Sequence, residues 1–128
     1  MKKRVIIVDD SKAVIATAEL ALEEMISSRA IEFISYLNPA QLLEALQNGS
    51  ENFDLLISDV NMPQMNGLDL SRAIKADERY KTKPIIILTT ESSNEIKMMG
   101  KEIGVTGWMV KPFSDEKLVK SLKMILGI

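Results

Sequence analysis

Residues 5–10, Val5-Ile6-Ile7-Val8-Asp9-Asp10, join an uninterrupted apolar run to two aspartates. Short apolar runs of this kind predict strands that are buried on both faces, as in parallel sheets covered by helices. Similar runs recur, and we expect strands at residues 5–8, 31–36, 54–58, 84–88 and 108–110. The run at 31–36 includes Glu32 and Ser35 and is therefore expected at a sheet edge, whereas burial on both faces is expected for the other four.

Amphipathic patterns between these runs predict helices. We expect them over residues 12–27, from Asn38-Pro39, from Asn66 to about Asp77, from a Ser92–Glu95 capping box, and from Ser114 to residue 126. The expected inward stripes are Ile15, Ala18, Leu22 and Met25; Leu70, Ala73 and Ile74; Ile96, Met99 and Ile103; and Leu118, Leu122 and Ile125. Asp10 or Ser11 is expected to cap the first helix.

Five alternating βα units with short connections predict an α/β fold with an open, doubly wound parallel sheet. The strand order 2-1-3-4-5 does not follow from the residues; it is the known order of flavodoxin-like sheets and is adopted from that class. With 128 residues and no internal linker, we expect one domain over residues 1–128 and no effector domain.

The composition excludes several kinds of chemistry. The chain has no cysteine and no histidine, which excludes disulfides, thiolate or imidazole metal sites and Ser–His catalysis. A net charge of −2 argues against a general nucleic-acid binder. The apolar run of residues 5–8 is too short for a signal peptide, and no stretch is long enough to span a membrane, so we expect a cytoplasmic protein that does not bind membranes.

Polar residues follow four of the expected strands. They are Asp9-Asp10, Asp59, Thr89-Thr90 and Lys111-Pro112. One aspartate at a strand end is usually a cap or a turn residue, but the carboxyl ends of parallel strands meet at one edge of the sheet, where ligands bind. In the adopted order, Asp59 lies between the acidic pair and Thr89, with Lys111 beyond. Three crowded carboxylates need a cation, and oxygen-only ligands suit Mg²⁺. A phosphoryl group on Asp59 could then be held from both sides.

The same residues form motifs that resemble a known family. The motifs are Asp9-Asp10-Ser11-Lys12, DVNMPQMNG at residues 59–67, Thr89, and Lys111-Pro112-Phe113. Together they resemble the receiver domains of response regulators over the whole chain, and in particular the CheY-like single-domain members. The D-x-x-M-P-x-M-N-G run is highly specific for this family.

The resemblance implies a role for each matching residue. Asp59 would be the phospho-acceptor. Asp10, Asp59 and the backbone carbonyl of Asn61 would ligate Mg²⁺, and Asp9 would act through metal-bound water. Thr89 would be the switch hydroxyl, Lys111 would be the phosphoryl partner, and the Lys111–Pro112 peptide bond would be cis. The implied function is a phosphorylation switch of two-component signalling, such as chemotaxis, with no enzymatic turnover beyond its own phosphorylation and dephosphorylation. A histidine kinase would be the phosphodonor.

The resemblance also implies a surface for an output protein such as a flagellar motor switch, and a monomeric chain. This surface would comprise the helix that begins near Ser92, the strand at 108–110 and the last helix. Met98 beside Lys97 and Lys101 could form a docking surface there, or these side chains could simply be solvated.

Two residues depart from the family pattern. Trp108 occupies the switch-aromatic position, where tyrosine or phenylalanine is usual, and it could either rotate as a switch or simply pack under the last helix. Thr90 stands where alanine or glycine is typical, and it could either narrow access to the phosphoryl group or only end the strand.

Two other classes of protein are disfavoured. A phosphatase of the haloacid-dehalogenase kind needs a D-x-D motif after its first strand and usually a cap domain, whereas Asp9 and Asp10 are adjacent and no cap is expected. A flavodoxin-like cofactor carrier needs a phosphate loop rich in glycine and hydroxyl residues after the first strand, where this chain has acidic residues.

Overall fold

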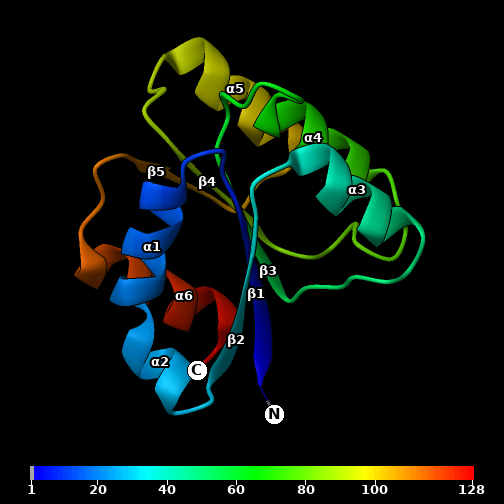
Figure 1. Cartoon of the computed structure of the whole chain (residues 1–128). Helices are drawn as coiled ribbons and strands as arrows, with labels where there is room; N and C mark the ends of the chain where they lie inside the picture. The colour runs from blue at the N-terminus through cyan, green and yellow to red at the C-terminus, as the bar shows by residue number, and fades with distance from the viewer. Residues whose placement is uncertain (1) are drawn as a thin grey trace.

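Strands and helices alternate throughout residues 2–128, the part of the chain that the computed structural model describes (Figure 1). In chain order the elements are β1 (Lys3–Val8), α1 (Lys12–Ala21), α2 (Glu23–Ser27), β2 (Ile31–Tyr36), α3 (Pro39–Gln47), β3 (Leu55–Ser58), α4 (Gly67–Lys75), β4 (Ile85–Thr89), α5 (Asn94–Ile103), β5 (Gly107–Val110) and α6 (Asp115–Leu126). All five expected strands are present: β2 has the predicted bounds, and the ends of the other four differ from the predictions by at most two residues.

The five strands form one parallel sheet in the order β2-β1-β3-β4-β5, which confirms the expected doubly wound, flavodoxin-like fold. Side chains alternate between its two faces. One face packs against α3, α4 and α5, and the other against α1, α2 and α6 (Figure 1). Strand β2 lies at an edge, as Glu32 and Ser35 predicted. Within residues 2–128, no helix is long and apolar enough to cross a membrane.

The first predicted helix is interrupted. Residues 12–27 form two helices, α1 and α2, separated at Leu22, which ends the first and precedes the second. The apolar stripe survives the break, because Ile15, Ala18, Leu22 and Met25 are all buried. Periodicity alone therefore cannot reveal the interruption. Ser11, one of the two expected caps, begins α1 by accepting a hydrogen bond from the Val14 amide.

Helix α5 begins one residue later than predicted. Its cap is Ser93 rather than Ser92, because the Ser93 hydroxyl accepts the hydrogen bond from the Ile96 amide. The predicted inward stripe is also partly wrong: Ile96 and Ile103 pack against the core, but Met99 is exposed. Gly100, which is buried, is the residue that faces the sheet at this level.

Strand β5 is less buried than predicted. It is the second edge strand, and its residues are half-buried or exposed, because only β4 pairs with it. Trp108 in β5 packs on the sheet face covered by α5, next to Gly100, and not under the last helix, α6. The simple packing interpretation thus named the wrong helix.

Candidate functional site

Three carboxylates converge at the carboxyl ends of β1 and β3. Asp9, Asp10 and Asp59 each offer an oxygen within 4.8 Å of the other two. Asp9 and Asp59 are buried, at 1% and 7% exposure, whereas Asp10 is exposed. The convergence follows from the topology, because β1 and β3 are neighbours and Val8 pairs with Ser58, one residue before each aspartate.

The backbone and nearby amides orient these carboxylates. The Asp9 amide donates to the Tyr36 carbonyl at 3.1 Å, and the Asp59 amide donates to the Val8 carbonyl at 3.2 Å. One oxygen of Asp9 accepts from the Ser11 amide at 2.9 Å, and one oxygen of Asp59 accepts from the Val60 amide at 2.7 Å. Each buried carboxylate is therefore held in place while its second oxygen points into the site.

Lys111 reaches both second oxygens. Its Nζ lies 2.8 Å from Asp9 Oδ2 and 3.3 Å from Asp59 Oδ2, and its amide donates to the Thr89 carbonyl at 2.9 Å. The following bond, Lys111–Pro112, is cis, as expected. The sequence placed Lys111 beyond Thr89, on the side of Asp59 away from the acidic pair. That placement is wrong, because the lysine side chain reaches back across the carboxyl ends of the strands and contacts Asp9 directly.

The charges of this site are incompletely balanced. Burial raises the pKa of Asp9, and the hydrogen bonds from Lys111 and Ser11 only partly offset that rise. Burial by itself lowers the pKa of Lys111, but Asp9 and then Asp59 outweigh this effect and raise it. One ammonium thus faces three carboxylates, which is an arrangement that a further cation would stabilise.

Thr89 is buried at the end of β4, next to β3, as the strand order predicted. Its hydroxyl oxygen accepts a hydrogen bond from the Glu91 amide at 3.2 Å. Trp108 donates its indole N–H to the Glu91 carbonyl at 3.1 Å. The predicted switch hydroxyl and the aromatic residue at the switch position therefore contact the same residue, Glu91.

Two open cavities flank the acidic cluster. One of about 340 Å³ is lined by Asp10, residues 60–63 and Asn66. The other, of about 320 Å³, lies between α1 and the Lys111-Pro112-Phe113 segment, and Thr90 lines it. Thr90 is thus exposed beside Lys111. A residue that narrows access to a phosphoryl group at this site would have to lie in such a position.

Gly67 is a site residue whose role the sequence did not reveal. A Cβ atom there would lie 1.7 Å from the Asp59 carbonyl oxygen, so only glycine allows α4 to approach the backbone of Asp59 this closely. The Gly67 amide donates to the Val60 carbonyl at 2.8 Å. The feature of the sequence that could have identified Gly67 is its position directly after Asn66, the N-cap of α4.

The donor set fits Mg²⁺. Every side chain that converges here, apart from Lys111, offers oxygen, and exposed Asp10 leaves room for water, which Mg²⁺ retains when bound. Asp9, Asp10 and Asp59 would hold the ion, together with the Asn61 carbonyl that the family resemblance adds.

Comparison with known proteins decides the family. A profile of the response regulator receiver domain matches residues 5–123. The chain belongs to the response regulator receiver family. Receivers generally bind Mg²⁺ at an acidic cluster and act in two-component signalling, and this chain has such a cluster.

The relatives of this receiver include chemotaxis proteins. Chemotaxis protein CheY1 of Helicobacter pylori J99 is 35% identical over 126 residues, which covers 97% of each chain. The structure of CheY4 of Vibrio cholerae superposes with a TM-score of 0.83 at 37% identity and covers 98% of this chain and 99% of that one. A BeF3-activated DrrB receiver domain superposes with a TM-score of 0.80 at 26% identity and full coverage of both chains. The chain is therefore a CheY-like receiver.

Proposed function

We propose that this receiver is a phosphorylation-dependent switch of chemotaxis type, which takes its phosphoryl group on Asp59 from a histidine kinase. The observation that carries the proposal is the convergence of Asp9, Asp10 and Asp59 within 4.8 Å, with Lys111 Nζ 3.3 Å from Asp59. Of the three carboxylates, Asp59 is the one that follows β3. This strand lies between β1, which the other two carboxylates follow, and β4, which carries Thr89.

The proposed chemistry is a simple displacement. An oxygen of the Asp59 carboxylate attacks the phosphorus of a phosphohistidine, a P–O bond forms, the P–N bond breaks, and the departing imidazole takes a proton from solvent. Lys111 neutralises negative charge on the transferred oxygens, and Asp9 and the Val60 amide keep Lys111 and Asp59 in place. Mg²⁺, when bound, supplies further neutralisation of charge on the same oxygens. Hydrolysis of the acyl phosphate then returns Asp59 to a carboxylate.

The proposal extends to partners. The chain would act as a monomer in the cytoplasm, where a kinase has access to ATP, without nucleic-acid binding or substrate turnover. An output protein, such as a flagellar motor switch, would bind the face formed by α5, β5 and α6. Support comes from the chemotaxis names of the relatives and from the exposed Met98, Val110 and Met124 on that face.

The test is labelling by a small phosphodonor. Wild-type protein incubated with acetyl phosphate and Mg²⁺ should gain one phosphoryl group by mass spectrometry, and Asp59→Asn should gain none. Asp69→Asn is the matched control, because Asp69 is an exposed aspartate on α4 that pairs with Arg72 and lies outside the acidic cluster. Labelling of Asp59→Asn at the wild-type level would overturn the assignment.

A further inference from the structure

Strand β3 is apolar except for its last residue, Ser58. All four of its residues, Leu55–Ser58, are fully buried. Burial of a hydroxyl is unfavourable unless the hydroxyl forms a hydrogen bond. Ser58 Oγ donates to the carbonyl oxygen of Asp59 at 2.9 Å. The hydroxyl therefore acts on the backbone of the proposed phospho-acceptor, although the motifs that resemble the receiver family begin only at Asp59.

The peptide bond between Asp59 and Val60 connects this hydroxyl to the acceptor carboxylate. Its carbonyl accepts from Ser58 Oγ, and its N–H donates to Asp59 Oδ1 at 2.7 Å. Because a peptide bond is planar, the two groups turn together. A rotation that moves the carbonyl away from Ser58 also moves the N–H away from the carboxylate. With Oδ1 held in this way, Oδ2 lies 3.3 Å from Lys111 Nζ.

Helix α4 confines the same carbonyl from the other side. A Cβ atom on Gly67 would lie 1.7 Å from the Asp59 carbonyl oxygen, 2.8 Å from its carbon and 3.0 Å from Ser58 Oγ. Ser58 faces this helix because it lies two residues after Leu56, which packs in the apolar cluster on the α4 side of the sheet. The space admits a small side chain, and serine is a small side chain that can donate. Alanine would fit there, but it would remove the donor from the carbonyl.

We infer that Ser58 is a positioning residue for phosphoryl transfer. Its hydroxyl fixes the peptide plane between Asp59 and Val60, and through the Val60 amide this plane orients the carboxylate that accepts the phosphoryl group. The inference rests on the proposed function and concerns the same site. Ser58 acts through the backbone and not on the reacting atoms. Without its hydroxyl the carboxylate gains rotational freedom, and a nucleophile that is less well oriented reacts more slowly.

The orientation of the peptide plane can be measured without any ligand. In Ser58→Ala the amide proton of Val60 should move upfield in NMR spectra and show a steeper temperature dependence, because its hydrogen bond to Asp59 Oδ1 weakens. Ser71→Ala is the matched control: Ser71 is also fully buried, and its hydroxyl donates to the Gly67 carbonyl at 2.8 Å. This control should leave the Val60 amide unchanged. An unchanged amide in Ser58→Ala, or an equal shift in both variants, overturns the inference.

The consequence for the site is measured with a phosphoryl mimic. Calorimetry gives the affinity for beryllium fluoride at saturating Mg²⁺, and urea denaturation gives the stability of each variant. Loss of one orienting hydrogen bond should weaken binding in Ser58→Ala by about fivefold. Ser71→Ala should bind the mimic like the wild type, even if both variants lose similar stability. Equal weakening in both variants contradicts the inference, because a packing defect would affect the two serines alike.

A second substitution separates the donor from the space that it fills. Ser58→Cys retains a side chain of similar shape but has only a weak donor, so its affinity for the mimic should resemble that of Ser58→Ala. Wild-type affinity in Ser58→Cys would show that the side chain only fills space.

The outcomes also distinguish this inference from the proposed function. Failure of the wild-type protein to bind the mimic, or binding that persists in Asp59→Asn, overturns the proposed function. Binding that depends on Asp59 but is unchanged in Ser58→Ala overturns only the role of Ser58.

Discussion

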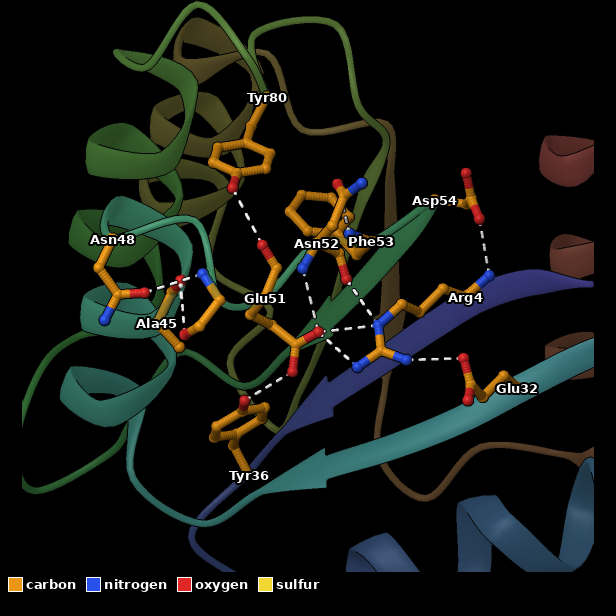
Figure 2. Close-up of polar contacts among 11 residues, drawn as sticks. Arg4, Glu32, Tyr36, Ala45, Asn48, Glu51, Asn52, Phe53, Asp54 and Tyr80 are labelled. Atoms are coloured by element: carbon orange, nitrogen blue, oxygen red, sulfur yellow. Dashed lines mark hydrogen bonds and ion pairs between the residues drawn. The ribbon is translucent and has the colours of Figure 1, made fainter.

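Two clusters of charged side chains surround buried carboxylates in this molecule, and they differ in how far the negative charge is balanced. In the first, which we call the Glu51 cluster, Glu51 is surrounded by Arg4, Tyr36 and the Asn52 amide, and Arg4 also pairs with Glu32 (Figure 2). In the second, the acidic site, Asp9, Asp10 and Asp59 converge, and Lys111 pairs with Asp9 and Asp59. Each cluster contains one cation, but the acidic site has an additional carboxylate.

The pKa values of Glu51 and Asp9 reflect this difference in charge balance. Burial by itself raises the pKa of Glu51, but the Tyr36 hydroxyl, the Asn52 amide and Arg4 together outweigh it, so the pKa is lowered. In the acidic site burial prevails, and the pKa of Asp9 is raised. Tyr36 belongs to the Glu51 cluster. Burial and then the hydrogen bond to Glu51 raise the pKa of its hydroxyl to about 12.

The comparison separates a structural cluster from a candidate functional site. Both oxygens of Glu51 have partners, so its charge stabilises the fold as it stands. The acidic site keeps like charges together, at a cost in stability that a bound cation would remove. A buried carboxylate is therefore a candidate for function when its partners are too few, and burial alone is not sufficient.

The largest effect should come from breaking the Glu51 cluster. Glu51→Ala leaves Arg4 and the Tyr36 hydroxyl without their acceptor and should lower the free energy of unfolding by about 2–4 kcal/mol, less than for a fully buried pair because Arg4 is partly exposed. Urea denaturation measures the change. Glu44→Ala, on the exposed face of α3, is the control and should change stability by less than about 0.5 kcal/mol. A loss in Glu51→Ala no larger than in the control would mean that the cluster contributes nothing.

A smaller effect of opposite sign should follow from relieving the acidic site. Asp10→Asn removes one of three like charges, so without Mg²⁺ the free energy of unfolding should rise by up to about 1 kcal/mol, limited by the exposure of Asp10. Mg²⁺ should stabilise the wild type and Glu51→Ala by similar amounts, and it should stabilise Asp10→Asn by less. The reason is that stabilisation by a bound ion increases with the affinity of the folded protein for that ion. Unchanged stability without metal would show that the three carboxylates do not repel one another.

The pH dependence of stability should show the smallest difference. Because the pKa of Glu51 is lowered in the folded state, its contribution is complete above its ordinary value of 4.5 and is lost as the pH falls through the lower folded value. Glu51→Gln should therefore lose less stability than the wild type on acidification from about pH 5 to pH 3. Thermal unfolding at a series of pH values measures this. Parallel curves for the two proteins would contradict the lowered pKa.

Local patterns predicted elements reliably where one residue type decides the backbone. Asn38 and Ser114 cap their helices as predicted, and Asn66, predicted as the start of a helix, caps α4. Each of these side chains accepts a hydrogen bond from an amide two or three residues further along. The break at Leu22 and the exposure of β5 were not predictable in this way, since both depend on what packs against the segment. The choice of Ser93 over Ser92 as cap depends likewise on where the β4–α5 loop allows the helix to begin.

The sequence by itself determined that the chain alternates strands and helices, and that carboxylates, a threonine and a lysine follow particular strands. These properties reside in neighbouring residues, so periodicity and caps reveal them. Tertiary structure alone decided that Lys111 contacts Asp9, that Trp108 and Thr89 meet at Glu91, and that Arg4 pairs with Glu51, which lies 47 positions away. Such contacts depend on strand order, register and the face on which each side chain emerges. No local pattern encodes these, because they arise only when separate strands are assembled into one sheet.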